Sequence, residues 1–208
     1  MNTKRGIHNI FYGILSQVIT MGMSLIIPRL VLVNLGSEAN GLMHSISTVF
    51  TYLTLLEAGV GKATNQALYK PLSCDDKVEI SRIMAATNKF YRRTGYVYAA
   101  AVLAFAVIYC LFIQTSLPKT VVVSVIVLSG ASSVLSYFVQ GKYRVLMEAE
   151  GKSYILVNIS TVTSIFTSVC KILLLVYGFG LVAIQSMYFF FSILQMVVIV
   201  SYIGRYYK

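Results

Sequence analysis

The chain has 208 residues, of which 57% are hydrophobic and only 12% are charged, with a net charge of +10. Soluble globular domains are about 45–50% apolar and about 25% charged, and a soluble core of this size could not bury the excess because its surface would still need polar cover. The composition therefore excludes an ordinary soluble domain and predicts an integral membrane protein.

Six apolar stretches are each long enough to cross a bilayer, for which a helix needs about 20 residues. They are predicted at residues 9–33, 41–60, 94–115, 120–141, 153–177 and 179–203. Stretches this long and uniformly apolar are typical of helices, which satisfy their own backbone in lipid. The first is too long for a signal peptide and lacks a small-residue cleavage site, so we expect it to remain. The sequence predicts an all-α membrane protein, a bundle of six transmembrane helices in one domain over residues 1–208.

A polar segment, residues 61–93, separates the second and third spans. Within it, apolar residues recur at Ile80, Ile83, Met84 and Phe90, with charged residues between them. Acidic residues at 75 and 76 suit the start of a helix, where the dipole favours negative charge. We expect an amphipathic helix over about 75–90 that leads into the third span and lies at the lipid headgroups.

Lys and Arg gather on one side of the predicted spans. Fourteen of the 17 lie before the first span, within 61–93, after the fourth span or after the sixth, whereas the opposite loops hold only Lys119. The positive-inside rule then predicts that both termini are cytoplasmic. The same rule accounts for the positive net charge better than nucleic-acid binding does, so we expect no nucleic-acid partner.

Motifs of soluble enzymes fail on inspection. Residues 151–153 (Gly-Lys-Ser) resemble the end of a P-loop, but Leu146 stands where that motif needs a glycine. The only histidines, His8 and His44, suggest neither a metal site nor a catalytic dyad. The three cysteines are interpreted as reduced packing residues: Cys74, Cys110 and Cys170. We expect no enzyme activity, no cofactor and no metal.

The fifth span carries a polar stripe that ends in a cation. Ser160, Ser164, Thr167 and Lys171 fall at i, i+4, i+7 and i+11, which places them on one helix face. Two interpretations are open. Either the stripe lines a polar lumen, or Lys171 snorkels to the outer headgroups while the hydroxyls bond their own backbone.

The first span has a similar stripe, formed by Gly13, Gln17, Thr20 and Ser24. Arg29 lies about 140° from Ser24 on an ideal helix, and therefore off the stripe. A kink at the preceding proline would change that relation. Lumen and snorkel interpretations are both open for Arg29.

The second span adds a third stripe: His44, Ser47, Thr51 and Thr54. Glu57 follows it and either pairs with Lys62 or another basic residue at the cytoplasmic mouth, or serves as an ion-coupling carboxylate. Polar stripes on several helices indicate a shared hydrophilic interior. The residues that we expect to line it are Arg29, Lys171, Ser160, Ser164, Thr167, Gln17 and Thr51.

Several segments, in order along the chain, resemble those of one family of membrane transporters. They are Ile27–Leu30, Asn34–Leu42, Leu55–Gly61, Ala67–Leu72, Lys89–Arg93 and Glu148–Tyr154. Together they resemble the first hairpin, the second helix, the cytoplasmic loop and the linker between helices four and five of bacterial polysaccharide flippases. The flippases that the chain resembles transport the repeat units of capsular polysaccharide and O-antigen and belong to the multidrug/oligosaccharidyl-lipid/polysaccharide exporter superfamily. The resemblance covers nearly the whole chain.

The resemblance has implications for fold and function. Members of the family resemble two six-helix lobes with a cavity between them, and this chain is similar to the N-terminal lobe only. The resemblance implies alternating access that flips a lipid-linked diphosphate oligosaccharide across the bacterial plasma membrane. The chain would act as a fragment or half of the transporter, with a second lobe or by self-association. Assigning Arg29 and Lys171 to the anionic head group is our own inference, since cations suit that charge.

Two other functions are compatible with the sequence. The first is a lobe of a drug/cation antiporter of the same superfamily, which would favour an acidic lumen for which Glu57 is the only candidate. The second is a non-transporting membrane bundle that only assembles with partners.

Overall fold

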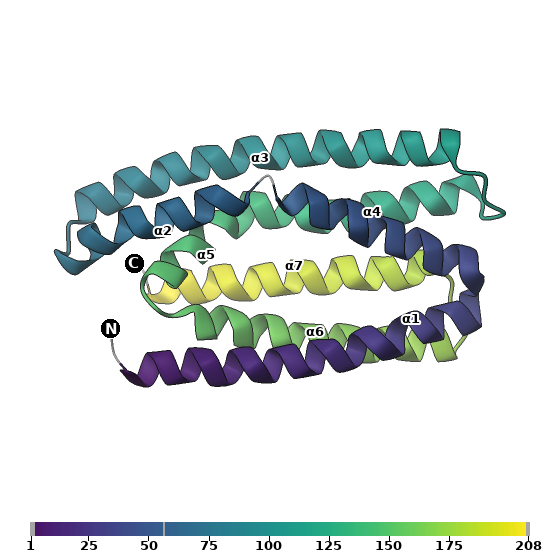
Figure 1. The fold of residues 1–208 in the computed structure, drawn as a ribbon, viewed down its shortest axis with the longest axis horizontal. Helices are drawn as coiled ribbons and strands as arrows, with labels where there is room; N and C mark the ends of the chain where they lie inside the picture. The colour runs from purple at the N-terminus through teal and green to yellow at the C-terminus, as the bar shows by residue number, and fades with distance from the viewer. Residues whose placement is uncertain (1–2, 56, 207–208) are drawn as a thin grey trace.

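The computed structural model describes residues 3–55 and 57–206, and in this part of the chain every regular element is an α-helix (Figure 1). The helices are α1 (Thr3–Thr54), α2 (Ala58–Ser73), α3 (Lys77–Phe112), α4 (Lys119–Val139), α5 (Gly141–Ala149), α6 (Ser153–Val176) and α7 (Leu181–Tyr206). Five of them, α1, α3, α4, α6 and α7, are long and apolar enough to cross a membrane. The prediction of an all-α protein with several apolar, membrane-length helices is confirmed.

The helix α1 contains the first predicted stretch and most of the second, and its one non-helical residue is Gly36. The second stretch, predicted over 41–60, ends earlier than expected, because α1 stops at Thr54 and α2 begins at Ala58. The backbone at Gly36 has φ 87° and ψ 174°, a conformation that glycine adopts readily because it has no Cβ. Figure 1 shows the chain reversing its direction at this point. We call residues 3–35 the first arm of α1 and residues 37–54 its second arm. The helix continues through Pro28, and the backbone there keeps helical φ/ψ.

The polar segment between the second and third stretches is more helical than the sequence indicated. The expected helix over 75–90 lies within α3, which continues without a break to Phe112. The side chain of Asp76 caps its start by accepting a hydrogen bond from the Glu79 backbone N–H at 3.1 Å. The preceding residues form α2, which packs against α3 and α5. Neither α2 nor α5 was identified from the sequence.

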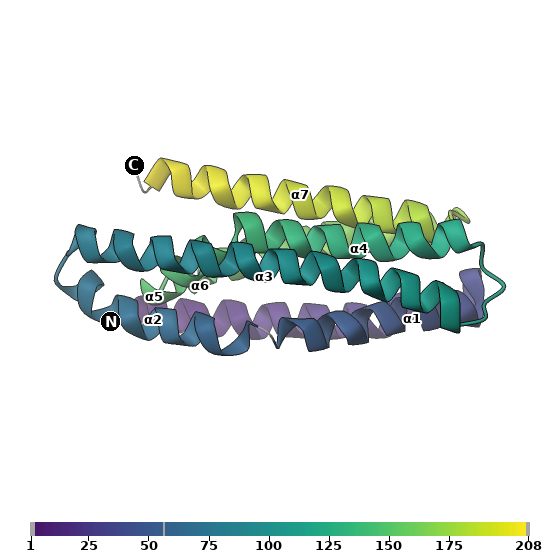
Figure 2. The ribbon, with the colours of Figure 1, turned by 90° about the horizontal axis from the view of Figure 1, so that it is seen from above.

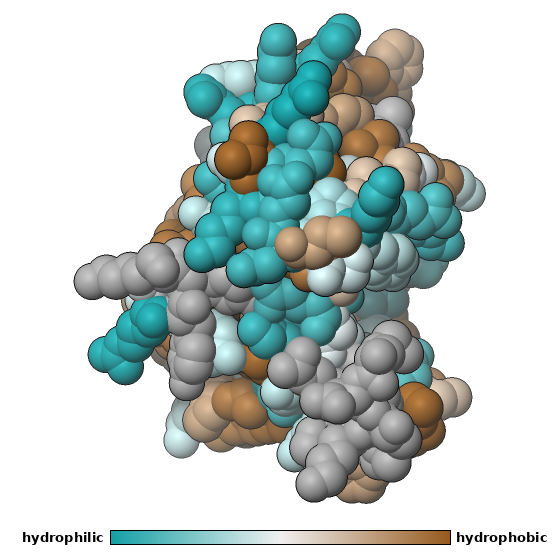
Figure 3. All heavy atoms as spheres, turned by 90° about the vertical axis from the view of Figure 1, so that its left-hand side faces the viewer, coloured by the Kyte–Doolittle hydropathy of each residue, from teal (hydrophilic) through white to brown (hydrophobic). Residues whose placement is uncertain are grey.

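Polar residues gather at one end of the bundle. The start of α1, the α2–α3 turn, α5 and the end of α7 all lie at the left of Figure 1. Seen from this end, hydrophilic side chains cover much of the surface (Figure 3). Between the ends, large apolar side chains stay exposed on the outer faces, among them Leu25 at 71%, Phe166 at 58% and Phe190 at 60%. Such faces are suited to lipid.

At the opposite end of the bundle, a carboxylate links α1 to the connection between α3 and α4. Glu38, just after the Gly36 bend, accepts hydrogen bonds from the Thr115 hydroxyl at 2.7 Å and from the Ser116 N–H at 2.7 Å and hydroxyl at 3.0 Å. The bond from Thr115, followed by those from Ser116, holds the pKa of Glu38 below its ordinary value. The second arm of α1 is thereby tied to the α3–α4 connection.

The order in which the helices pack determines where the candidate site lies. Seen from above, α1 and α2 lie on one side, α7 lies on the other, and α3 and α4 lie between them (Figure 2). The main packing partners are α3 with α4, α1 with α6, and α7 with both α4 and α6. The helix α6 is thus held between the first arm of α1 and α7.

Candidate functional site

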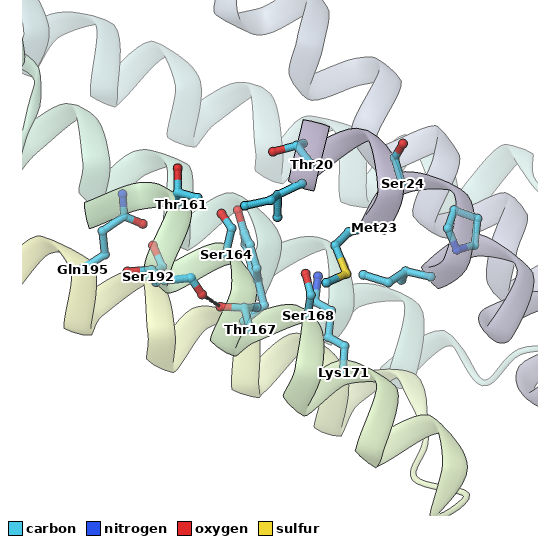
Figure 4. A pocket seen from close by; sticks show the side chains of 15 residues that line it. Thr20, Met23, Ser24, Thr161, Ser164, Thr167, Ser168, Lys171, Ser192 and Gln195 are labelled. Carbon is cyan, nitrogen blue, oxygen red and sulfur yellow. Dashed lines mark hydrogen bonds between the residues drawn. The ribbon is translucent and has the colours of Figure 1, made fainter. Parts of the chain in front are cut away.

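A polar cavity lies where α6 meets the first arm of α1 and α7. Its volume is about 400 Å³, and Ser164, Thr167 and Lys171 of the predicted α6 stripe line it. Thr20 and Ser24 of α1 lie on its other side (Figure 4). We call this the first cavity. The structure therefore brings together polar residues of two stripes that are more than 130 positions apart in the sequence.

Lys171 also lines a second cavity of about 400 Å³, between α6 and the second arm of α1. Thr51 lies in this cavity, and residues from α3, α4 and α7 complete its walls. Tyr188 of α7 lines both cavities, and the Lys171 ammonium group lies 4.7 Å from the centroid of its ring. A cation over an aromatic face is stabilised by the ring quadrupole. Lys171 thus occupies the boundary between two polar spaces.

No carboxylate neutralises Lys171 within the described residues. All seven acidic residues of the chain belong to that part, none of them lines the first or second cavity, and the ion pairs found there involve other cations. An unpaired ammonium group between membrane-length helices is costly unless water or an anion reaches it. The site is therefore electropositive.

The hydroxyl groups around Lys171 mostly donate to their own helices. Thr167 donates to the Thr163 carbonyl at 2.7 Å, and Thr20 to the Ser16 carbonyl at 2.8 Å. Thr51 donates to the carbonyl of Ser47 at 2.8 Å. A hydroxyl used in this way keeps its oxygen lone pairs for another donor. Backbone bonding of these hydroxyls is therefore compatible with a polar cavity, whose walls present acceptors.

Three of the predicted lining residues lie elsewhere. Arg29 and Gln17 are exposed on the first arm of α1 and line neither cavity. Ser160 lines a separate cavity of about 150 Å³, together with Arg144 and Glu148. Arg29 is seven positions from the Gly36 bend, a rise of about 10 Å at 1.5 Å per residue, which its long side chain can bridge by snorkelling.

Glu57 has a different partner from the one expected. Its carboxylate accepts a hydrogen bond from the Tyr91 hydroxyl at 2.6 Å, while the exposed Lys62 forms no ion pair with it in the described structure. Glu57 and Tyr91 line a third cavity of about 260 Å³, which also includes Arg144. The structure thus joins Glu57 to α3 rather than to the helix that follows it.

Sequence reasoning missed the contribution of α7. Gln185, Tyr188, Ser192 and Gln195 line one or more of the cavities. Their spacing of i, i+3, i+7 and i+10 places them on one face of the helix, within an arc of about 80° at ~100° per residue. This periodicity is present in the sequence, because two glutamines, a serine and a tyrosine recur at helical spacing in an otherwise apolar stretch.

No protein-family model, curated protein or solved structure matches the chain. Within the described residues, no group of three His, Cys, Asp or Glu side chains is placed to hold a metal ion. The two cavities that share Lys171 are therefore the strongest basis for a functional conclusion.

Proposed function

We propose that the chain forms one lobe of a transporter that flips a lipid-linked diphosphate oligosaccharide across the bacterial plasma membrane. The observation that carries the proposal is Lys171, a cation without a carboxylate partner at the boundary of two polar cavities. A Lys at the centre of a membrane helix costs about 2.5–3.5 kcal/mol on insertion scales, which is an upper value for Lys171 because it lies nearer the end of α6. A diphosphate would offset that cost through charge-assisted hydrogen bonds, and sugar hydroxyls would satisfy the acceptors of the walls.

The proposal includes six membrane passes, with both arms of α1 crossing. The second arm, residues 37–54, rises about 27 Å at 1.5 Å per residue, close to the ~30 Å thickness of the hydrocarbon core. The polar end seen in Figure 3 would then face the cytoplasm, in agreement with the distribution of Lys and Arg. Both termini would lie on that side.

A single lobe supplies one wall of an alternating-access cavity, which needs two units that rock against each other. The partner in the proposal is a second lobe or another copy of the same chain. Thr20, Ser24 and Ser164 are exposed although they line the first cavity. A ligand or a partner surface could therefore reach this wall.

The drug/cation antiporter is the less favoured function. A lipophilic cation would be repelled by Lys171, and no acidic residue lines the first or second cavity. Glu57 lies in the third cavity, where Tyr91 already donates to it. A bundle that only assembles with partners would have no use for an unpaired cation facing two cavities.

Ligand binding in nanodiscs tests the proposal. The purified chain is titrated with a prenyl diphosphate that carries a disaccharide, and binding is followed by native mass spectrometry. Lys171→Ala should weaken binding tenfold or more, because a hydrogen bond to a charged group contributes about 1.5–3 kcal/mol and about 1.4 kcal/mol is tenfold. Lys171→Arg keeps the charge and should retain most of the affinity.

The matched control is Lys119→Ala, which removes the same charge from an exposed position at the start of α4. Its affinity should equal that of the wild type. Equal binding by the wild type and Lys171→Ala would overturn the proposal. So would tighter binding of tetraphenylphosphonium than of the diphosphate, which would favour the antiporter. Absence of any ligand binding would favour the assembling bundle.

A further inference from the structure

The second cavity contains a buried polar atom that the protein leaves without a partner. Gln185 of α7 is only 3% exposed, and its side-chain carbonyl oxygen accepts no hydrogen bond within the described residues. Gln185 lines the second cavity together with Lys171. Buried amide oxygens are nearly always hydrogen-bonded, because an unpaired one has lost its hydrogen bonds to water without gaining any from the protein, which costs free energy. A fully buried acceptor that lines a cavity beside a cation is therefore a feature of a binding site.

Three of the neighbouring hydroxyl groups already donate to their own helices. Thr51 and Thr54 of α1 donate to the carbonyls of Ser47 and Thr51, at 2.8 and 2.7 Å. Ser129 of α4 donates to the carbonyl of Val125 at 2.7 Å. All three hydroxyls belong to the cavity wall and offer lone pairs rather than protons. The Tyr98 hydroxyl of α3 lines the same cavity and, like the Gln185 oxygen, is buried without a partner in the described residues. The wall therefore combines one cation and one free hydroxyl with several acceptors.

A complementary ligand has an anionic group and, beside it, hydroxyl or amide donors. The phosphate of phosphatidylcholine, whose headgroup has no hydrogen-bond donor, or of a sugar-free prenyl diphosphate meets only the first requirement. A sugar attached to the diphosphate meets both. The cavity volume of about 400 Å³ lies within the range of roughly 300–1,000 Å³ that is usual for small-molecule sites.

We infer that the second cavity binds the sugar next to the diphosphate, and that Gln185 is a specificity-determining residue that accepts a hydrogen bond from this sugar. The inference rests on the proposed function and names the part of the ligand that each residue meets. Lys171 binds the anionic group whether or not a sugar is present. Gln185 distinguishes the glycosylated ligand from the sugar-free one, because the sugar-free ligand leaves a buried acceptor unpaired.

Two probes separate these roles: farnesyl diphosphate, and farnesyl diphosphate esterified with one N-acetylhexosamine. Both are titrated against the full chain in nanodiscs of zwitterionic lipid. The wild type should bind the glycosylated probe about tenfold more tightly, which corresponds to about 1.4 kcal/mol. Gln185→Leu should reduce this ratio to about one while leaving the affinity for farnesyl diphosphate unchanged, because it removes the acceptor at similar volume.

The unchanged affinity for farnesyl diphosphate also shows that the variant is folded. Gln185→Asn retains a carbonyl acceptor and should keep part of the preference. Gln66→Leu makes the same chemical change at an exposed position of α2 and should keep the whole tenfold ratio.

The two proposals fail in different ways. If Gln185→Leu keeps the tenfold ratio, or if the wild type binds both probes equally, the role of Gln185 is refuted while Lys171 can still govern the affinity for farnesyl diphosphate. If Lys171→Ala leaves that affinity unchanged, or if neither probe binds, the proposed function fails and the inference fails with it.

Discussion

Gly130→Ala is expected to weaken the packing of α3 against α4. A Cβ at Gly130 would lie 2.3 and 2.7 Å from the two methyl carbons of Val102 on α3, and 3.0 Å from its Cβ. Ordinary contacts of this kind are 3.4–4 Å, so one helix would have to move by about 1 Å. Val102 cannot avoid the clash by rotation alone, because its Cβ is fixed to the backbone and its χ1 is stiff in a helix. Small residues allow this kind of close approach between membrane helices.

The magnitude follows from two opposing contributions. Overpacking a close-packed interface costs about 1–3 kcal/mol, and this contact belongs in the upper half of that range because all three carbons are too near. Alanine regains about 0.5–1 kcal/mol relative to glycine inside a helix. The expected net loss is about 1–2.5 kcal/mol of unfolding free energy, which is the upper half of the overpacking cost less the gain from alanine. Gly22→Ala, where a Cβ would meet nothing within 4 Å, should be neutral or slightly stabilising.

Equilibrium unfolding in mixed detergent and SDS micelles, followed by circular dichroism, measures both variants. Val102→Ala in the Gly130→Ala background provides a second check, because it removes the two closest carbons. The double variant should lose less stability than the sum of the single variants, with a coupling of about 0.5–3 kcal/mol. If Gly130→Ala is as stable as Gly22→Ala, or if the double variant is merely additive, the close approach of α3 and α4 at this point is refuted.

Two further predictions concern the ends of the bundle. Glu38 has a lowered pKa because Thr115 and Ser116 donate to it, so its stabilisation is present above its ordinary pKa of 4.5 and is lost as the pH falls through the lower folded-state value. The thermal midpoint of the wild type should exceed that of Glu38→Gln at neutral pH, and this gap should close in acid; a gap that persists would show that the carboxylate is not involved. Single cysteines placed at 37 and 119 in a background without the three native cysteines should react with an impermeant maleimide in intact cells, whereas cysteines at 77 and 152 should react only after lysis. Labelling of position 77 from outside would reverse the proposed orientation.

Local periodicity made much of the α6 wall predictable. Ser164, Thr167 and Lys171 share a face because the helical repeat is set by the backbone, and that face is the one that lines the first cavity. The same reasoning could have been applied to α7, where polar residues recur on one face. What periodicity cannot provide is the identity of the opposing helix, since this depends on packing between residues far apart in the chain.

The partners of Glu57 and the location of Gln17 illustrate that limit. Glu57 bonds with Tyr91, 34 positions away, rather than with a basic residue in the next turn. Gln17 shares a stripe with Thr20, but only Thr20 reaches the first cavity. A stripe is defined by the angular positions of residues around one helix. The extent of a cavity depends instead on how the neighbouring helices pack against that face. Short helices such as α5 are also difficult to predict, because they have too few turns to show a period.

Arg29 and Lys171 are two cations in membrane-length helices whose surroundings in the structure differ. Arg29 lies near the Gly36 bend that ends the first arm of α1, and Lys171 lies near the end of α6, and each would be costly in hydrocarbon. Arg29 is exposed, about 10 Å of helix rise from the Gly36 bend, so its side chain can reach the headgroups without help from the bundle. Lys171 points into the bundle, where Tyr188 contacts it through a ring face that cannot cancel a full charge. Because no carboxylate compensates it in the described structure, its charge remains available to a ligand. In the proposed function, Arg29 would reduce its cost by reaching the headgroups, whereas Lys171 would reduce its cost through what enters the cavities, and this difference makes Lys171 the residue to test first.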